Sequence, residues 1–79
     1  METTETIGTI ERRYQSLSKG HKAIADFILK SYDKAAYMTA AKLGEEVGVS
    51  ESTVVRFTTE LGFEGYPQFQ KALQEDLKT

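Results

Sequence analysis

Hydroxyl, basic and small apolar side chains cluster between residues 50 and 59 of this 79-residue chain. Ser52 and Thr53 can donate hydrogen bonds to phosphate oxygens or to the edges of bases. The guanidinium of Arg56 can bridge O6 and N7 of guanine, and Val55 can contact the methyl group of thymine. These residue types therefore indicate contacts with nucleic acid, and Arg56 is the best candidate for a base or phosphate contact.

Two neighbouring residues extend this candidate set. Thr59 adds a further hydroxyl to the same segment. Glu51 can accept a hydrogen bond from N4 of cytosine, or it can simply stabilise the positive N-terminal end of its own helix. The helix-end interpretation of Glu51 is favoured, because acidic residues are common in first turns.

Residue types that catalysis needs are sparse in this chain. His21 is the single histidine, cysteine is absent, and no paired acid lies at a productive spacing near His21. General acid–base and metal chemistry need convergent partners, so we interpret His21 as a helix-surface side chain. Glu45 and Glu46 diverge on a helix because they are adjacent, and no glycine-rich phosphate motif occurs. We expect no enzyme activity, no metal site and no cofactor.

The element that must position these residues is predicted over residues 39–61, as two short helices joined at Gly48. Leu43 and Val47 form an apolar i, i+4 pair on the first helix, and the small Gly44 allows the second helix to cross closely. The chain must turn sharply at Gly48, with a positive φ that glycine adopts without strain. This layout is typical of a helix-turn-helix, here over about residues 40–59.

The second helix of this pair is predicted over residues 51–61, with Ser50 as its N-cap and Gly62 closing it. Val54, Phe57 and Leu61 form one buried stripe. The opposite, exposed face then carries Ser52, Thr53, Val55, Arg56, Thr59 and Glu60. A helix-turn-helix inserts its second helix in the major groove, so the sequence predicts a recognition helix for double-stranded DNA.

The whole chain is predicted to be all-α, a five-helix domain with a homeodomain-like three-helix core and two flanking helices. The other helices are expected at about residues 6–17 and 18–32, from Thr39 as an N-cap, and from Pro67 as the first helical residue. Residues 33–38 are expected to form a linker that Tyr37 and Met38 anchor to the core. Phe63 is expected to pack inward.

Two groups outside the recognition helix are further candidates for phosphate contacts. Thr39 and Lys42 lie at the start of the first helix of the motif, which crosses the DNA backbone. Lys42 is interpreted equally well as a solvated surface lysine. Tyr66 precedes the last helix, whose first N–H groups can clamp a phosphate with help from Gln68 and Lys71. An ordinary capped helix start has the same pattern.

The first predicted helix carries a narrow apolar seam of Ile7, Ile10, Tyr14 and Leu17, spaced 3, 4 and 3 residues apart. Such a seam serves either packing on the domain's own core or contact with a second copy. Both interpretations stay open at this point, and a homodimer is expected.

The charge of the chain argues against uniform attraction to DNA. The formal net charge is -2, whereas DNA-binding domains are usually basic. Residues 12–34 hold six cations and two acids, whereas residues 39–71 hold three cations and five acids. Phosphate attraction must therefore come from selected faces. A helix-turn-helix-shaped protein-interaction or dimerisation module with little DNA affinity is the alternative function.

The surroundings of the chain are predicted from its composition. No apolar run approaches the ~20 residues that span a bilayer, so no membrane association is expected. The first six residues are polar and acidic, unlike a secretory signal. We expect a cytoplasmic protein.

The motifs Ser-Glu-Ser-Thr-Val-Val-Arg-Phe (50–57) and Leu-Gly-Phe-Glu-Gly-Tyr (61–66) carry a family resemblance. Together with residues 17–29 and 38–44, they resemble the N-terminal domain of the RpiR family of bacterial transcriptional regulators. The resemblance runs from about residue 7 to residue 77. It implies a five-helix domain that binds operator DNA, usually as a dimer, and controls genes of sugar or amino-sugar catabolism. It assigns DNA contacts to Ser50, Ser52, Thr53, Val55 and Arg56.

The chain departs from this family in two places. Family members often carry basic residues where this chain has Thr58, Thr59 and Glu60, and alanine is more usual at Gly44. Full-length members also carry a C-terminal sugar-isomerase-type domain that senses a phosphosugar. That domain is absent from residues 1–79, so we expect this chain to be one DNA-binding domain of a longer regulator.

Overall fold

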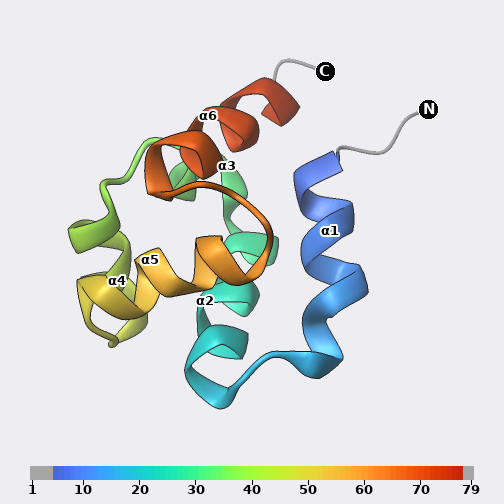
Figure 1. Cartoon of the computed structure of the whole chain (residues 1–79). Coiled ribbons are helices and arrows are strands. Elements are labelled where there is room, and N and C mark those ends of the chain that lie inside the picture. Colours follow the sequence, from blue (N-terminus) through green and yellow to red (C-terminus); the bar gives the residue numbers. More distant parts are fainter. Residues whose placement is uncertain (1–4, 78–79) are drawn as a thin grey trace.

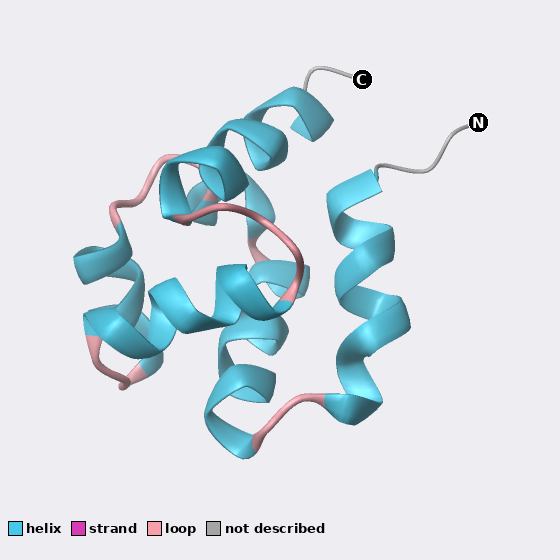
Figure 2. Cartoon of the chain, in the orientation of Figure 1, coloured by secondary structure: helices cyan, strands magenta, loops and turns pink. Residues whose placement is uncertain are grey.

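The computed structural model describes residues 5–77, and every regular element within that range is helical. Short loops join the helices, as Figure 2 shows. The elements are α1 (Glu5–Arg13), a 3-10 turn η1 (Tyr14–Ser16), α2 (Lys19–Lys30), α3 (Tyr32–Ala35), α4 (Ala40–Val47), α5 (Glu51–Glu60) and α6 (Tyr66–Leu77). The prediction of an all-α domain is confirmed.

A three-helix unit of α2, α4 and α5 forms the centre of the molecule, and each of the three helices contacts the other two. α1 and α6 pack against each other beside this unit (Figure 1). The Phe57 ring of α5 meets the Phe69 ring of α6 edge-on, with 5.9 Å between centroids. The largest fully buried side chains come from five helices: Ile10, Ile24, Ile28, Leu43, Val54, Phe57, Phe69 and Leu73.

The predicted linker contains a one-turn helix, α3, which raises the number of α-helices within residues 5–77 to six. Ala35 and Ala36 are fully buried there and anchor the segment. Tyr37, by contrast, is 71% exposed, so its predicted role as an anchor is wrong. Two small side chains fit against the core in a tight turn, which leaves the bulky ring outside. Met38 does pack against the core, as predicted.

Two other boundaries differ slightly from those predicted. α1 ends at Arg13, and the next three residues continue as a 3-10 turn. α6 begins at Tyr66, one residue before Pro67. Helix ends commonly shift by a residue or two, because the last turn frays or tightens. Within the described range, no helix is long and apolar enough to cross a membrane.

The apolar seam of α1 is used within the domain. Ile10 is fully buried and Leu17 almost so, while Ile7 and Tyr14 pack partly buried against the same core. The N–H of Thr6 donates to Asp76 Oδ2 at 3.2 Å, which ties the start of α1 to the end of α6. The intramolecular interpretation is therefore the correct one, because Ile10 and Leu17 retain almost no surface for a second copy.

Candidate nucleic-acid interface

The turn between α4 and α5 has the geometry that the sequence predicts. Gly48 adopts φ +93°, in the left-handed region that favours glycine. The N–H groups of Gly48 and Val49 both donate to the Gly44 carbonyl, at 2.7 and 2.9 Å. A Cβ atom on Gly44 would lie only 2.7 Å from the carbonyl oxygen of Val49. Glycine at position 44 therefore permits the close turn, although it lowers the helix propensity of α4.

Ser50 caps α5, as predicted. Its Oγ accepts from the N–H of Thr53 at 3.2 Å. The same Oγ lies 2.8 Å from Thr53 Oγ1 and 3.1 Å from Ser52 Oγ. The first turn of α5 thus presents three linked hydroxyls whose positions are set by the cap.

One face of α5 is buried and the other is exposed. Val54, Phe57 and Thr58 are fully buried, and Leu61 is nearly so. The burial of Thr58 was not predicted. Its hydroxyl donates to the Val55 carbonyl at 2.7 Å, which satisfies the polar atom inside the core. The departure from the family at position 58 therefore faces the core, where it has no access to a phosphate.

Five of the six residues that the sequence places on the outer face of α5 are exposed, namely Ser52, Val55, Arg56, Thr59 and Glu60, and Glu51 is exposed as well. Thr53 is half-buried at one side of this face. The Thr59 hydroxyl donates to the Val55 carbonyl at 3.2 Å. Arg56 is exposed, and its side chain forms no hydrogen bond or ion pair with any other residue in the described part of the chain. Its guanidinium is thus available to an external acceptor.

Lys42 has a different environment. Its Nζ lies 3.5 Å from Glu45 Oε1 and 3.6 Å from Glu46 Oε2, on the exposed surface of α4. These carboxylates offset the positive charge of Lys42, so its attraction for phosphate is weaker than that of an unpaired lysine. Thr39 acts as the N-cap of α4, because its Oγ1 accepts from the N–H of Lys42 at 3.1 Å.

Tyr66 does not present its side chain to the interface. Its ring is buried, and its hydroxyl donates to the Met38 carbonyl at 2.6 Å. Burial raises the pKa of Tyr66 to about 12. The structure therefore corrects the placement of the Tyr66 side chain, which holds the loop before α4. The remaining candidates for the predicted phosphate contact at the start of α6 are its backbone N–H groups and the exposed side chains of Gln68 and Lys71.

A groove of about 450 Å³ borders α5 on the side of α4 and α6. Its lining is mainly neutral, and it brings together predicted site residues from three elements. The lining consists of Thr39, Ala40, Glu51, Val55, Gly65, Tyr66, Pro67 and Gln70. The amide of Gln70 also donates to the Met38 carbonyl, at 2.9 Å. Sequence spacing gave no signal for Gln70, since its partner lies 32 residues away.

The opposite border of α5 is formed by the end of α1 and the start of α2. A Cβ atom on Gly20 would lie 3.9 Å from Thr53 Cγ2. Arg13 Nη1 donates to the carbonyl of Glu60 at 3.1 Å and so caps the last turn of α5. Helical periodicity predicted neither of these two approaches.

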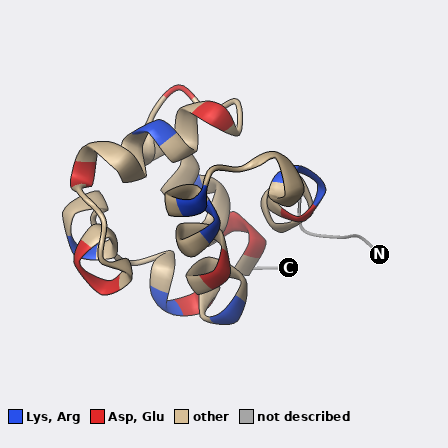
Figure 3. Cartoon of the chain, turned by 90° about the horizontal axis from the view of Figure 1, so that it is seen from below, with Lys and Arg blue, Asp and Glu red and all other residues tan. Residues whose placement is uncertain are grey.

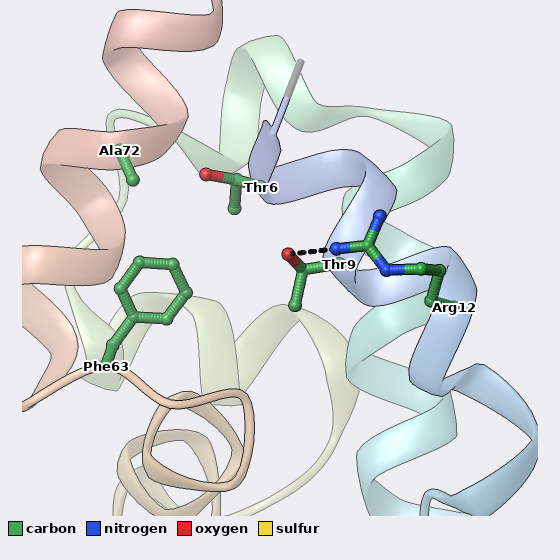
Figure 4. Close-up of a pocket in the computed structure, with 5 residues that line it drawn as sticks. All are labelled: Thr6, Thr9, Arg12, Phe63 and Ala72. Carbon is green, nitrogen blue, oxygen red and sulfur yellow. Dashed lines mark hydrogen bonds between the residues drawn. The ribbon is translucent and has the colours of Figure 1, made fainter. Parts of the chain in front are cut away.

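A smaller cavity, of about 170 Å³, lies between α1, α6 and the turn before α6. Thr6, Thr9, Arg12, Phe63 and Ala72 line it (Figure 4). Arg12 Nη2 donates to Thr9 Oγ1 at 3.2 Å. This lining offers no carboxylate, imidazole or thiol for acid–base or nucleophilic chemistry. Among residues 5–77, no group of three His, Cys, Asp or Glu side chains is placed to hold a metal ion.

Comparison with known proteins adds the deciding observation. The model of the helix-turn-helix domain of the rpiR family matches residues 4–79. This chain belongs to the rpiR family. The family resemblance seen in the sequence is thereby confirmed, and the chain is a helix-turn-helix domain of a family of transcriptional regulators, which implies DNA binding.

Several rpiR relatives are similar over most of this chain. The uncharacterized HTH-type transcriptional regulator YfhH of Escherichia coli K12 is 41% identical over 68 residues, covering 86% of this chain and 24% of its own length. An uncharacterized HTH-type regulator of Haemophilus influenzae is 39% identical over 66 residues, covering 84% and 23%. The HTH-type transcriptional regulator HexR of Pseudomonas aeruginosa is 34% identical over 68 residues, covering 86% and 24%.

The chain thus spans about a quarter of the length of the curated relatives that it matches. No solved structure was found to match it.

Proposed function

We propose that this rpiR-family domain binds double-stranded operator DNA sequence-specifically, with α5 in the major groove. The main support for this proposal is the environment of the Arg56 side chain. It is exposed and unpaired within the described residues, on a helix whose opposite face is fully buried. A guanidinium in this position can read guanine through two parallel hydrogen bonds.

The remaining site residues divide by their position around α5. Ser52, Arg56 and Thr59 follow one another at i, i+4 and i+7 along the exposed face, which is the spacing of a single line on a helix. Ser50, Glu51, Thr53 and Val55 flank that line, and Thr39 and Lys42 lie at the start of α4. We assign base contacts to the central line and to Val55, and backbone contacts to the flanking hydroxyls and Lys42.

We further propose that the domain acts as a homodimer in the cytoplasm on an operator with two half-sites. Helix-turn-helix dimers bind half-sites about one helical turn apart. We place the dimer surface away from Ile10 and Leu17, because both side chains are buried within the domain. Control of sugar or amino-sugar genes, through a phosphosugar-sensing domain absent from this chain, rests on the family resemblance alone. In this role the domain is a regulator, without catalytic activity.

The test is selection of bound duplexes from a random-sequence pool, followed by binding titrations with Arg56→Ala. Removal of the Arg56 guanidinium should cost about 1–3 kcal/mol of binding free energy and should relax the preference at one base pair. Lys30→Ala is the control, since Lys30 is an exposed cation at the far end of α2. The proposal is wrong if no sequence is enriched, or if Arg56→Ala binds the selected duplex like the wild type.

One observation favours the alternative of a protein-interaction module. α4 and α5 together carry Lys42 and Arg56 against four glutamates, and Lys42 is already paired with two of them. An acidic helix-turn-helix repels phosphates unless other elements compensate. Absence of any binding to duplex DNA at low salt would support this alternative.

A further inference from the structure

Most of the positive charge beside the recognition helix lies on one border. Three cations, Arg13, Lys19 and Lys22, lie at the end of α1 and the start of α2. We call these three residues the α2 flank. The opposite border, along α4 and α6, offers Lys42, which is paired with glutamates, the exposed Lys71 of α6, and the carboxylate of Glu51.

The start of α2 lies directly against α5. The position of a Cβ on Gly20 is 3.9 Å from Thr53 Cγ2, in the first turn of α5. The His21 ring contacts the Phe57 ring edge-on, with 5.7 Å between centroids. In Figure 1 the first turn of α2 extends below α5, and Figure 3 looks onto this end. The basic segments of α2 lie there between α5 and α1.

The three cations of the α2 flank are engaged to different degrees. Arg13 donates to the Glu60 carbonyl, so it mainly holds α5 in place. Lys22 is half-buried with its Nζ 5.5 Å from the centroid of the Tyr14 ring, and it forms no ion pair with residues 5–77. Lys19 is exposed, and its side chain has no hydrogen bond or ion pair with residues 5–77.

The acidic residue nearest to these lysines along α2 is itself engaged. Asp26 Oδ1 accepts a hydrogen bond from the Tyr14 hydroxyl at 2.8 Å, and this hydrogen bond raises the pKa of Tyr14. None of the ion pairs found within residues 5–77 joins Asp26 to Lys19 or Lys22. The α2 flank thus presents two lysines that form no ion pair within residues 5–77, together with Arg13 and against the carboxylate of Asp26.

A helix in the major groove has a phosphate backbone on each side of it, and phosphate contacts set its register. We propose that Lys19 and Lys22 bind backbone phosphates of the DNA strand that borders the groove on the α2 side. The α2 flank lies outside the helix-turn-helix itself. It supplies most of the electrostatic attraction to DNA phosphates, because α4 and α5 carry more acidic than basic residues. The inference rests on the proposed DNA-binding function and assigns its phosphate contacts.

The experiment measures the salt dependence of binding to a 30-base-pair duplex of arbitrary sequence, by fluorescence anisotropy with Lys19→Gln and Lys19→Gln/Lys22→Gln. Each lysine that no longer neutralises a phosphate should reduce the slope of log K against log[salt] by about 0.9. Affinity at low salt should fall several-fold for the single variant and further for the double variant. Lys30→Gln removes the same charge from the other end of the same exposed helix face, and it should keep the wild-type slope.

The outcomes separate this inference from the proposed function. If the wild type binds no duplex, both fail. If it binds, and Arg56→Ala relaxes specificity while both glutamine variants keep the wild-type slope, the α2 flank has no role and only this inference is overturned. Lys22→Arg keeps the charge above Tyr14 and should restore binding that Lys22→Gln weakens. Unchanged circular dichroism of all variants excludes unfolding as the cause.

Discussion

The two borders of α5 are built by different means, and each supplies something that the other lacks. On the α4–α6 side, side chains of α6 fix the backbone of the loop before α4, since Tyr66 and Gln70 both donate to the Met38 carbonyl. Gln74 likewise donates to the Ala36 carbonyl at 2.9 Å. On the α2 side, Lys19 and Lys22 form no ion pair within residues 5–77.

The shape of the groove beside α5 and the positive charge beside α5 therefore come from different parts of this domain. One border determines where α4 begins and how wide the adjacent groove is, with little net positive charge. The other border provides cations that the helix-turn-helix itself lacks. Substitutions on the first border should therefore change stability and positioning, whereas those on the second should change the salt dependence of DNA binding.

The largest effect is expected at the turn between α4 and α5. Gly44→Val should lower the free energy of unfolding by about 2–3 kcal/mol, because its side chain would overlap the Val49 carbonyl. Urea denaturation followed by circular dichroism measures this decrease. Gly20→Ala is the matched control: its Cβ has 3.9 Å to the nearest atom, and it should be neutral or stabilising by up to ~1 kcal/mol. Equal stability of both variants would contradict the close turn.

A smaller decrease in stability is expected on the α4–α6 border. Tyr66→Phe removes one of two donors to the Met38 carbonyl and should lower the free energy of unfolding by about 1.5 kcal/mol at neutral pH. The slope of DNA binding against salt should stay at the wild-type value, because the number of cations is unchanged. A changed slope would show that the two borders are not separable.

The dependence of stability on alkaline pH is a second, independent test of the role of Tyr66. The pKa of Tyr66 is raised from 10.0 to about 12 in the folded state, so the protonated form is favoured there. Its contribution is therefore complete below pH 10 and is lost as the pH rises towards 12. Tyr66→Phe should lose less stability over that interval than the wild type. Tyr37→Phe, which alters an exposed ring, should follow the wild-type curve.

The smallest effect is expected at the cap of α5. Ser50→Ala should cost about 1 kcal/mol of stability, because the Thr53 N–H loses its acceptor. Ser52→Ala removes a neighbouring exposed hydroxyl without uncapping the helix, and its change should stay within about 0.5 kcal/mol. Thermal unfolding of the two variants side by side measures the difference. Identical melting curves would show that the Ser50 hydroxyl contributes nothing as a cap.

Much of the fold and of the candidate site was predictable because it depends on short-range interactions. The caps at Ser50 and Thr39 bond to N–H groups three residues ahead. The left-handed turn at Gly48 and the division of α5 into two faces depend on neighbours within a few positions. The exposed position of Arg56 follows from the same periodicity.

Other features required the three-dimensional arrangement. The seam of α1 had two equivalent interpretations, and only the position of Ile10 in the core decided between them. The exposure of Tyr37 depended on how α3 packs. The inward direction of Tyr66 depended on a carbonyl 28 residues away. Periodicity describes one helix at a time, so it cannot identify which distant backbone group a side chain meets.

Local sequence was enough to specify the five longer helices, the sharp turn between α4 and α5, and which side of α5 faces outward, because hydrogen bonds across three or four residues and helical periodicity control these features. Tertiary structure alone decided what surrounds α5: Arg13 lies 47 residues from its partner Glu60, and Gly20 meets Thr53. Such pairs form only when separate helices pack on a common core. The charge beside α5 is therefore a property of the assembled fold.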